Sequence, residues 1–321
     1  MSGPAIVAAG PLAAPAPAIL ARFGELAVAE RDSLDVLLPL LRDAVGLVAR
    51  GPTRVDAELL AAAPRLRVIG RSGVGADGID LEAATARGIP VVVTPGVNAV
   101  AVAEGAIALL LALIKRLPEL DRAVRDGRWR ERDTLSPGDV AGSTLAVAGF
   151  GHIGREVARL AGALGMDVLV CDPQVGAAQA AEAGFASASL EDAVARADHL
   201  SLHVPLHAST AGLVSPELLG LARPGLRLVN LSRGAVTPLD GLLEGLRSGA
   251  LGGVGLDVFE PEPPDPAHPL FARPDVICSP HALALTPGAN RAVFTAMSEG
   301  MAAVLDGGRA THVANPGVYG R

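Results

Sequence analysis

Short apolar runs alternate with helical patterns along almost the whole chain. Early on, the apolar runs AIVAA, VGLVA, RVIG and IPVVV are separated by segments such as DVLLPLLRDA and AELLAAA, whose apolar positions recur at helical spacing. Parallel strands need a crossover connection, and strands that alternate with helices are therefore typical of a parallel sheet. The pattern predicts an open α/β unit over the first hundred or so residues.

The same alternation resumes at Thr144. The runs LAVA, VLVC, HLSLHV, LRLVNLS, GGVGLDV and DVICSP predict about six further strands with helices between them. Between the two parts lies the longest apolar run, Ala99 to Ile114, which contains Glu104 and is shorter than a bilayer-spanning helix. We interpret this run as a buried helix and expect no membrane association.

Three glycines mark the turn between the first two strands of the second part. Gly149, Gly151 and Gly154 have the G-x-G-x-x-G spacing, an amphipathic helix follows, and the next strand ends in Asp172. This arrangement is typical of a dinucleotide site, where the turn and the helix N-terminus bind the pyrophosphate. The terminal acid would accept the ribose hydroxyls and repel a 2′-phosphate, which favours NAD over NADP.

We therefore predict two doubly wound parallel-sheet α/β domains, since 321 residues exceed the size of a usual single core. A Rossmann NAD-binding domain is expected over residues 98–285. A discontinuous, flavodoxin-like substrate domain is expected over residues 1–97 and 286–321, with the last helical segment returning to the first unit.

Composition narrows the class of partner. The net charge is −7 and no basic cluster occurs, which argues against nucleic acid or an anionic membrane surface. Cys171 and Cys278 lack metal-ligand spacing, so we expect no metal site and a reducing, cytoplasmic setting. Prolines interrupt the apolar N-terminus, which does not resemble a secretory signal.

Polar side chains follow three predicted strands of the second domain: Arg233, Glu260 with Glu262, and His281. Parallel strands place their carboxyl ends at one edge, so these groups could meet beside a nicotinamide. Arginine binds a carboxylate, histidine protonates a carbonyl as hydride arrives, and a glutamate orients the imidazole. Taken singly, each could equally be a surface or turn residue, but together they suit reduction of a 2-keto acid.

At these motifs the chain resembles the D-2-hydroxyacid dehydrogenase family, and most closely its phosphoglycerate dehydrogenase branch. The resemblance rests on GFGHIGREVA, NLSRGAVT, GLDVFEPEPP and CSPH, and on GRSGVGADGIDLEAATARGIPVVVTPGVNAVAVAE in the first domain. It extends from about Val45 to about Asp306. It implies a homodimer that packs through the cofactor domain, and a small 2-hydroxy or 2-keto acid as substrate.

The resemblance also implies roles for individual residues. The catalytic set would be Arg233, Glu262 and His281, and Asp257 would bind the nicotinamide carboxamide. The expected cofactor contacts are Gly149, Gly151, His152, Ile153, Gly154, Asp172, His203, Pro205 and Asp257. The expected substrate contacts, all in loops after predicted strands, are Arg50, Arg71, Ser72, Gly73, Val74 and Asn98.

One departure from the family pattern concerns the substrate. After His281 the family usually has small residues, whereas this chain has Leu283 and Leu285, which would crowd the space near the nicotinamide. A glyoxylate or hydroxypyruvate reductase is therefore an alternative within the class. From another class, the same scaffold resembles corepressors that bind NAD as a signal. A turnover assay separates these alternatives.

Overall fold

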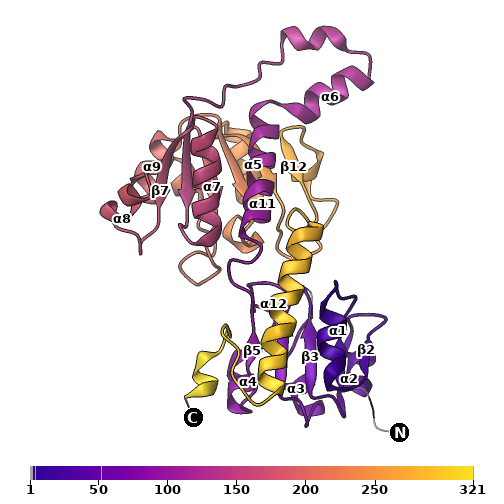
Figure 1. Cartoon of the computed structure of the whole chain (residues 1–321). Helices are drawn as coiled ribbons and strands as arrows, with labels where there is room; N and C mark the ends of the chain where they lie inside the picture. The colour runs from indigo at the N-terminus through magenta and orange to yellow at the C-terminus, as the bar shows by residue number, and fades with distance from the viewer. Residues whose placement is uncertain (1–2, 4, 52, 321) are drawn as a thin grey trace. The chain divides into compact units, whose positions relative to one another are not determined.

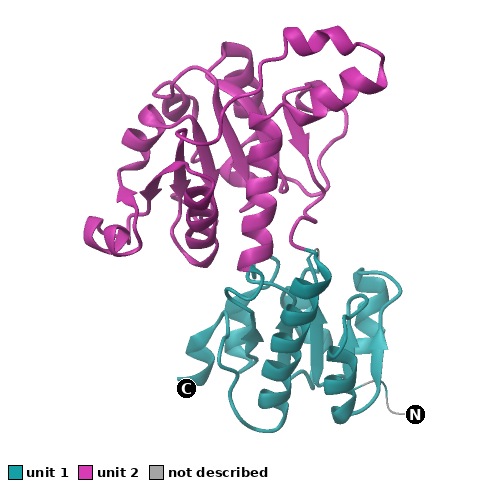
Figure 2. Cartoon of the chain, turned by 45° about the horizontal axis from the view of Figure 1, so that its top comes forward, with its two compact units in different colours: residues 1–98, 285–321 teal, residues 99–284 magenta. Residues whose placement is uncertain are grey.

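The chain forms two compact units in the computed structural model, which describes residues 3, 5–51 and 53–320. One unit comprises residues 1–98 and 285–321, and the other residues 99–284 (Figure 2). The boundaries expected from the sequence lie one residue away from these at each crossing. Each unit is an α/β sandwich built on a parallel sheet, as the alternation of apolar runs predicts.

The first unit contains a five-stranded parallel sheet in the order β2-β1-β3-β4-β5. Its strands are β1 (Ile6–Ala8), β2 (Leu26–Val28), β3 (Gly46–Ala49), β4 (Val68–Arg71) and β5 (Val91–Val92). Its α-helices are α1 (Ala16–Leu20), α2 (Leu34–Leu41), α3 (Ala57–Ala62), α4 (Leu81–Ala86) and α12 (Pro287–Leu305).

Alternate residues of β1 face opposite layers of this unit. Ile6 and Ala8 pack among residues of α1 and α12, whereas Val7 packs among residues of α2 and α3. Helices therefore cover both faces of the sheet, as in a doubly wound fold. Strand β2 has no counterpart among the predicted elements, because this short edge strand is only partly buried and lacks a continuous apolar run.

The second unit contains a seven-stranded parallel sheet in the order β12-β11-β10-β9-β6-β7-β8. Its strands are β6 (Thr144–Ala148), β7 (Asp167–Cys171), β8 (Ala186–Ser187), β9 (His199–Leu202), β10 (Leu226–Asn230), β11 (Leu251–Leu256) and β12 (Val276–Cys278). The strand order reverses between β6 and β9, and ligands of open α/β sheets bind at such a switch point. The two-residue strand β8 is the one that the sequence did not predict.

Helices α5 (Ala99–Ile114) and α7 (His152–Ala163) lie side by side on one face of this sheet (Figure 1). The other face is covered by α9 (Leu190–Arg196), α10 (Pro216–Leu219) and α11 (Leu239–Ser248). The apolar α5 is thus a core helix, as predicted, and no helix in the described part of the chain has the length and apolar character to cross a membrane. After α5, helix α6 (Leu117–Arg125) and the 3-10 turn at Trp129–Asp133 extend beyond the sheet (Figure 1).

Candidate active site

The carboxyl end of β6 leads into α7 through the glycine turn. Gly149 has a φ of +89°, and a Cβ there would lie 2.5 Å from the carbonyl oxygen of His203. A Cβ on Gly154 would lie 1.9 Å from the Gly149 carbonyl oxygen. Gly151, just before α7, has nothing within 4 Å of the equivalent position. Packing therefore requires Gly149 and Gly154, whereas the space at Gly151 and the adjoining helix N-terminus fit a pyrophosphate group.

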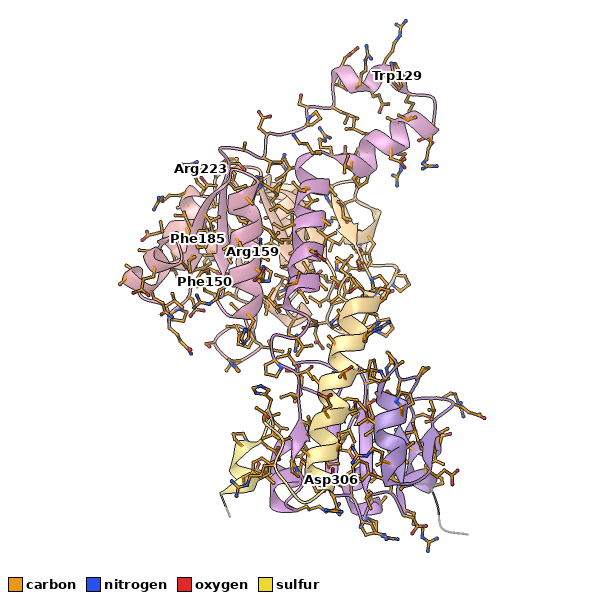
Figure 3. The ribbon with its side chains drawn as sticks, viewed as in Figure 1. Trp129, Phe150, Arg159, Phe185, Arg223 and Asp306 are labelled. Carbon is orange, nitrogen blue, oxygen red and sulfur yellow. The ribbon has the colours of Figure 1, made fainter. Side chains whose placement is uncertain are left out.

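Asp172 follows β7 and holds this turn in place. Its Oδ2 accepts a 2.8 Å hydrogen bond from the Phe150 N–H, and its Oδ1 accepts one of 2.8 Å from the Gln174 N–H. Phe150 in turn packs edge-to-face on Phe185, with ring centroids 6.1 Å apart (Figure 3). Since a carboxylate has about four acceptor positions, Asp172 can hold the turn and still accept a ribose hydroxyl.

His203 comes directly after β9 and lies against the glycine turn. Its Nε2 is 2.7 Å from Ser201 Oγ, and its buried Nδ1 has no hydrogen-bond partner among the described residues. Burial lowers the pKa of this imidazole to about 3, so the ring is neutral at physiological pH. His203 is therefore suited to line the cofactor site and unsuited to donate a proton as an imidazolium. The other expected cofactor contacts are placed as follows: His152 and Pro205 are exposed and Ile153 is half-buried.

The loop after β10 presents Arg233 and is built on a buried asparagine. The Asn230 side-chain N–H groups donate to the Arg233 carbonyl at 2.9 Å and to Thr237 Oγ1 at 2.8 Å. Its Oδ1 accepts from the Ser232 N–H at 2.9 Å and from the Ser232 hydroxyl at 2.7 Å. Asn230 is not among the site residues expected from the sequence, although its place in the run NLSRG, at a strand end before the arginine, was a usable signal.

The Arg233 loop packs directly on the loop that follows β11. A Cβ on Gly234 would lie 2.0 Å from the carbonyl carbon of Phe259, so only glycine allows this approach. From the second loop, Glu262 Oε1 accepts a 3.0 Å hydrogen bond from the Phe259 N–H. Glu262 Oε2 lies 2.9 Å from Nδ1 of His281, which follows β12. The structure thus pairs His281 with Glu262 rather than with Glu260.

The electrostatics of the pair suit an acid and base. The hydrogen bond to Glu262, together with the charges of Glu262 and Asp257, raises the pKa of His281 above its ordinary value, against burial and the Arg233 charge. Burial would raise the pKa of Glu262, but the bonds from His281 and the Phe259 N–H hold it below its ordinary value. Glu262 therefore stays ionised and holds the Nδ1 proton, which leaves Nε2 for a substrate.

Asp257 fixes the backbone around His281. This buried carboxylate, just beyond β11, accepts hydrogen bonds at Oδ1 from Ser279 Oγ at 2.5 Å and from the Ala282 N–H at 2.9 Å. The Leu283 N–H lies 3.5 Å from Oδ1 and 3.4 Å from Oδ2. His281 itself has a φ of 53°, which is uncommon outside glycine. The contacts of Asp257 thus hold an unusual turn, a role that the sequence did not indicate.

The Leu283 side chain packs against helix α5. A Cβ on Gly105 of α5 would lie 2.7 Å from the Leu283 Cβ, so this glycine makes room for the leucine. Leu283 belongs to the apolar cluster around α5 and α7, whereas Leu285, in the first unit, is 56% exposed. Of the two leucines expected to crowd the space near the nicotinamide, Leu283 is therefore the one whose position is fixed by packing.

In the first unit, the expected substrate contacts lie in loops at the carboxyl ends of β3, β4 and β5. Gly73 has a φ of 149° and open space around its Cβ position, and the Val74 side chain is 47% exposed. Ser72 and Asn98 are half-buried. The Ser72 N–H donates to the Ala49 carbonyl at 3.2 Å and the Gly73 N–H to the Arg71 carbonyl at 2.8 Å, so Val74 carries the N–H of this loop that is suited to meet a carboxylate.

The two arginines among the expected substrate contacts are bound to backbone carbonyls. Arg71 Nε donates to the Gly75 carbonyl at 2.7 Å, and its Nη2 to the Gly51 carbonyl at 3.2 Å, while Nη1 donates to the Arg50 carbonyl. Arg50 Nη1 donates to the Pro11 carbonyl. Arg71 therefore ties the loops after β3 and β4 together, which the position of this residue in the sequence did not reveal.

The glycine turn at the switch point of a parallel sheet is typical of a dinucleotide-binding α/β domain, and the Arg233, Glu262 and His281 loops lie at the same sheet edge. The family model of the D-isomer specific 2-hydroxyacid dehydrogenase NAD-binding domain matches residues 107–282. The chain belongs to the D-isomer specific 2-hydroxyacid dehydrogenase family, and its second unit is the family's NAD-binding domain.

Similar proteins fall in the same family. D-3-phosphoglycerate dehydrogenase of Mycobacterium bovis is 39% identical over 307 residues, which are 96% of this chain and 58% of that protein. A protein of Thermus thermophilus is 36% identical with a TM-score of 0.87, covering 96% of this chain and 99% of the other. A glyoxylate reductase from Paecilomyes thermophila has a TM-score of 0.87 at 27% identity, covering 98% and 99%. The chain spans only about half the length of the curated relatives it matches.

Proposed function

We propose that this protein is an NAD-dependent oxidoreductase that interconverts a small D-2-hydroxy acid and its 2-keto acid, acting on a CH–OH group. The observation that carries the proposal is the 2.9 Å contact between His281 Nδ1 and Glu262 Oε2, within electrostatic range of Arg233. These groups follow β10, β11 and β12, at the same sheet edge as the glycine turn. A metal is not part of the proposal.

NAD supplies the hydride acceptor, or as NADH the donor, and would be held by the glycine turn, Asp172 and the His203 segment. His281 Nε2 holds the proton that the carbonyl oxygen gains during reduction, and takes it back during oxidation. Glu262 orients the ring and stabilises its charged form. Arg233 binds the substrate carboxylate, since guanidinium and carboxylate match as a pair of hydrogen bonds. The Val74 N–H supports the same carboxylate, in a loop whose Ser72 and Gly73 N–H groups bind the Ala49 and Arg71 carbonyls. Arg50, Arg71 and Asn98 lie around the substrate or support its site.

A panel of 2-hydroxy and 2-keto acids, followed by NADH absorbance, tests this proposal. The panel includes 3-phosphoglycerate, because the Mycobacterium bovis relative is a D-3-phosphoglycerate dehydrogenase. Turnover of at least one D-2-hydroxy acid supports an enzyme. NAD binding without turnover of any acid would favour the corepressor-like alternative.

Glyoxylate or hydroxypyruvate is the second candidate substrate, and the carbonyl contacts of Arg71 and Arg50 favour it. Donors that bind backbone carbonyls are less available for a substrate phosphate. The Arg71→Ala variant distinguishes the candidates. An equal rise in KM for phosphorylated and unphosphorylated acids means that Arg71 supports the loops, whereas a selective rise for the phosphorylated acid means that it binds phosphate.

We also propose a homodimer formed through the cofactor domain. The segment after α5 exposes Leu117, Val124 and Trp129, at 52%, 59% and 61%, and Trp129 lies at its far end (Figure 3). Apolar exposure of this kind marks an association surface. Sedimentation analysis should show a dimer that Val124→Ser with Trp129→Ser converts to monomer, while Leu221→Ser, at another 48% exposed leucine, leaves it intact. A monomeric wild-type protein would contradict the proposal.

A cytoplasmic location is proposed as well. Both cysteines are free; Cys171 is buried, which raises the pKa of its thiol to about 12 and keeps it unreactive, whereas Cys278 is exposed at the end of β12. Fractionation of cells that express the full-length protein tests the location.

A further inference from the structure

A polar cavity lies at the opposite edge of the second unit's sheet from the glycine turn. Its volume is about 280 Å³. It is bounded by the end of α5, the start of α6 and the amino-terminal ends of β10, β11 and β12. The lining residues that carry polar side chains are Arg116, Glu119, Ser136, Arg227 and Asp275. Because a water takes up about 30 Å³ of liquid, this space accommodates a tetrahedral ion with several waters.

Two of the cations converge on this cavity, and one of them is unpaired. Arg227, the second residue of β10, is half-buried, and within residues 3, 5–51 and 53–320 no hydrogen bond or ion pair involves its guanidinium. Arg116 and Arg227 both line the cavity, and burial together with the charge of Arg116 lowers the pKa of Arg227. Arg116 keeps a left-handed backbone, with a φ of 51°, beside Glu119.

The carboxylates of the cavity are already paired. Arg116 Nε and Nη2 donate to the two Glu119 oxygens at 2.9 and 2.6 Å. Asp275 accepts from Arg273 Nε and Nη2 at 2.8 and 2.6 Å. Each acid therefore pairs with an arginine other than Arg227, and Asp198 is the acid whose charge acts on Arg227. The half-buried Arg227 guanidinium thus leaves positive charge in the cavity that no hydrogen-bonded carboxylate of the described residues neutralises, and an anion bound there would offset that charge.

A second unpaired group stands next to Arg227 on the same face of the sheet. His199 of β9 is its register partner, is 1% exposed, and has no hydrogen-bond partner for either ring nitrogen among the described residues. Burial and the Arg227 charge lower the pKa of His199 to about 4, so the ring is neutral. A fully buried imidazole without a partner among the described residues thus adjoins the half-buried Arg227, although buried polar groups are normally satisfied.

We propose that this cavity is a binding site for a small tetrahedral oxyanion, of the phosphate or sulfate type, held by the guanidinium groups of Arg227 and Arg116 with the Ser136 hydroxyl. Arginine donors in two directions and a hydroxyl match the oxygens of such an ion. The site is separate from the catalytic loops, which lie at the carboxyl ends of the same strands. It does not depend on the proposed reaction and is tested without it.

Inorganic phosphate at constant ionic strength tests this site in the full chain, in the presence of NADH. The melting temperature should rise saturably with phosphate, because a ligand of the folded state alone stabilises it. Arg227→Met should weaken the apparent affinity at least about tenfold, the worth of one charge-assisted contact. Arg223→Met changes an exposed arginine near the start of β10 (Figure 3) and should leave the shift unchanged.

Two further variants keep the test decisive. Arg116→Gln should also weaken phosphate binding, and it tests the site independently if Arg227→Met does not fold. Arg233→Gln removes the proposed substrate arginine and should retain the phosphate shift. Loss of the shift in Arg233→Gln alone would mean that phosphate binds at the catalytic loops, and would overturn the proposal. Equal shifts in wild type, Arg227→Met and Arg116→Gln, or no saturable shift in the wild type, would overturn it as well.

Discussion

At the scale of single residues, the proposed function depends on the environment of one imidazole. His281 and Glu262 come from different loops, and neither stands out in the sequence by itself. Their contact, the Asp257 carboxylate and the nearby Arg233 charge set the protonation of His281 together. That the loops of Arg233, Glu262 and His281 meet at one sheet edge could be predicted because each follows a strand of one parallel sheet, whereas the choice of Glu262 over Glu260 came from the family resemblance.

The pH dependence follows from the direction of the pKa shift. Reduction requires protonated His281, so its rate falls as pH rises through the pKa of His281, which Glu262 holds above its ordinary value. Glu262→Gln removes the carboxylate and should move this limb of the kcat/KM profile to lower pH. Glu260→Gln, at the exposed glutamate two positions away, is the matched control and should leave the profile in place. Coincident profiles for all three proteins would show that Glu262 does not act on His281.

At the scale of elements, each functional loop depends on a contact that the sequence pattern does not display. Asn230 satisfies four hydrogen bonds within the Arg233 loop, and Asp257 holds the turn at His281. Periodicity locates strand ends, but it carries no information about which side chain turns inward to bind a backbone group. The supporting hydrogen bonds of Asn230 and Asp257 are therefore found in the structure and not in the sequence pattern.

Removing the Asn230 amide should loosen the arginine loop. Asn230→Ala deletes a fully buried hydrogen-bond network and should cost about 2–4 kcal/mol of unfolding free energy. The KM for the keto acid should rise more than the KM for NADH, because the loop presents Arg233. Urea denaturation and initial-rate kinetics measure the two effects, with Gln179→Ala, an exposed amide, as the control. Unchanged stability would mean that the loop is held by other contacts.

Asp172, at the end of β7, should determine the preference for NAD over NADP. A 2′-phosphate would meet the Asp172 carboxylate, so kcat/KM should favour NAD over NADP at least tenfold, about 1.4 kcal/mol of differential binding. Asp172→Asn should narrow that preference, and the Asn side chain still offers an oxygen to the Phe150 N–H. Comparable kcat/KM values for the two cofactors in the wild type would contradict this role of Asp172.

At the scale of the whole molecule, the alternation of apolar runs was enough to predict two parallel-sheet units. The apolar pattern did not predict strands β2 and β8. Strand β2 has three residues, none of them fully buried, and β8 has two, so both are too short to show a period of alternating apolar positions. The cavity at Arg227 was missed for a different reason. From the sequence, an arginine at the start of a strand is expected to be a solvated charge. The structure shows instead that Arg227 is half-buried and has no hydrogen-bond partner among the described residues.

His281 is proposed to serve as acid and base for a D-2-hydroxy acid. The most direct test of this role compares NADH formation from the D and L isomers of the best substrate, in the wild type and in His281→Ala. We expect turnover of the D isomer alone, a kcat roughly 10²–10⁴-fold lower in the variant, and unchanged NADH binding by fluorescence. Near-normal turnover by His281→Ala, or preference for the L isomer, would contradict it.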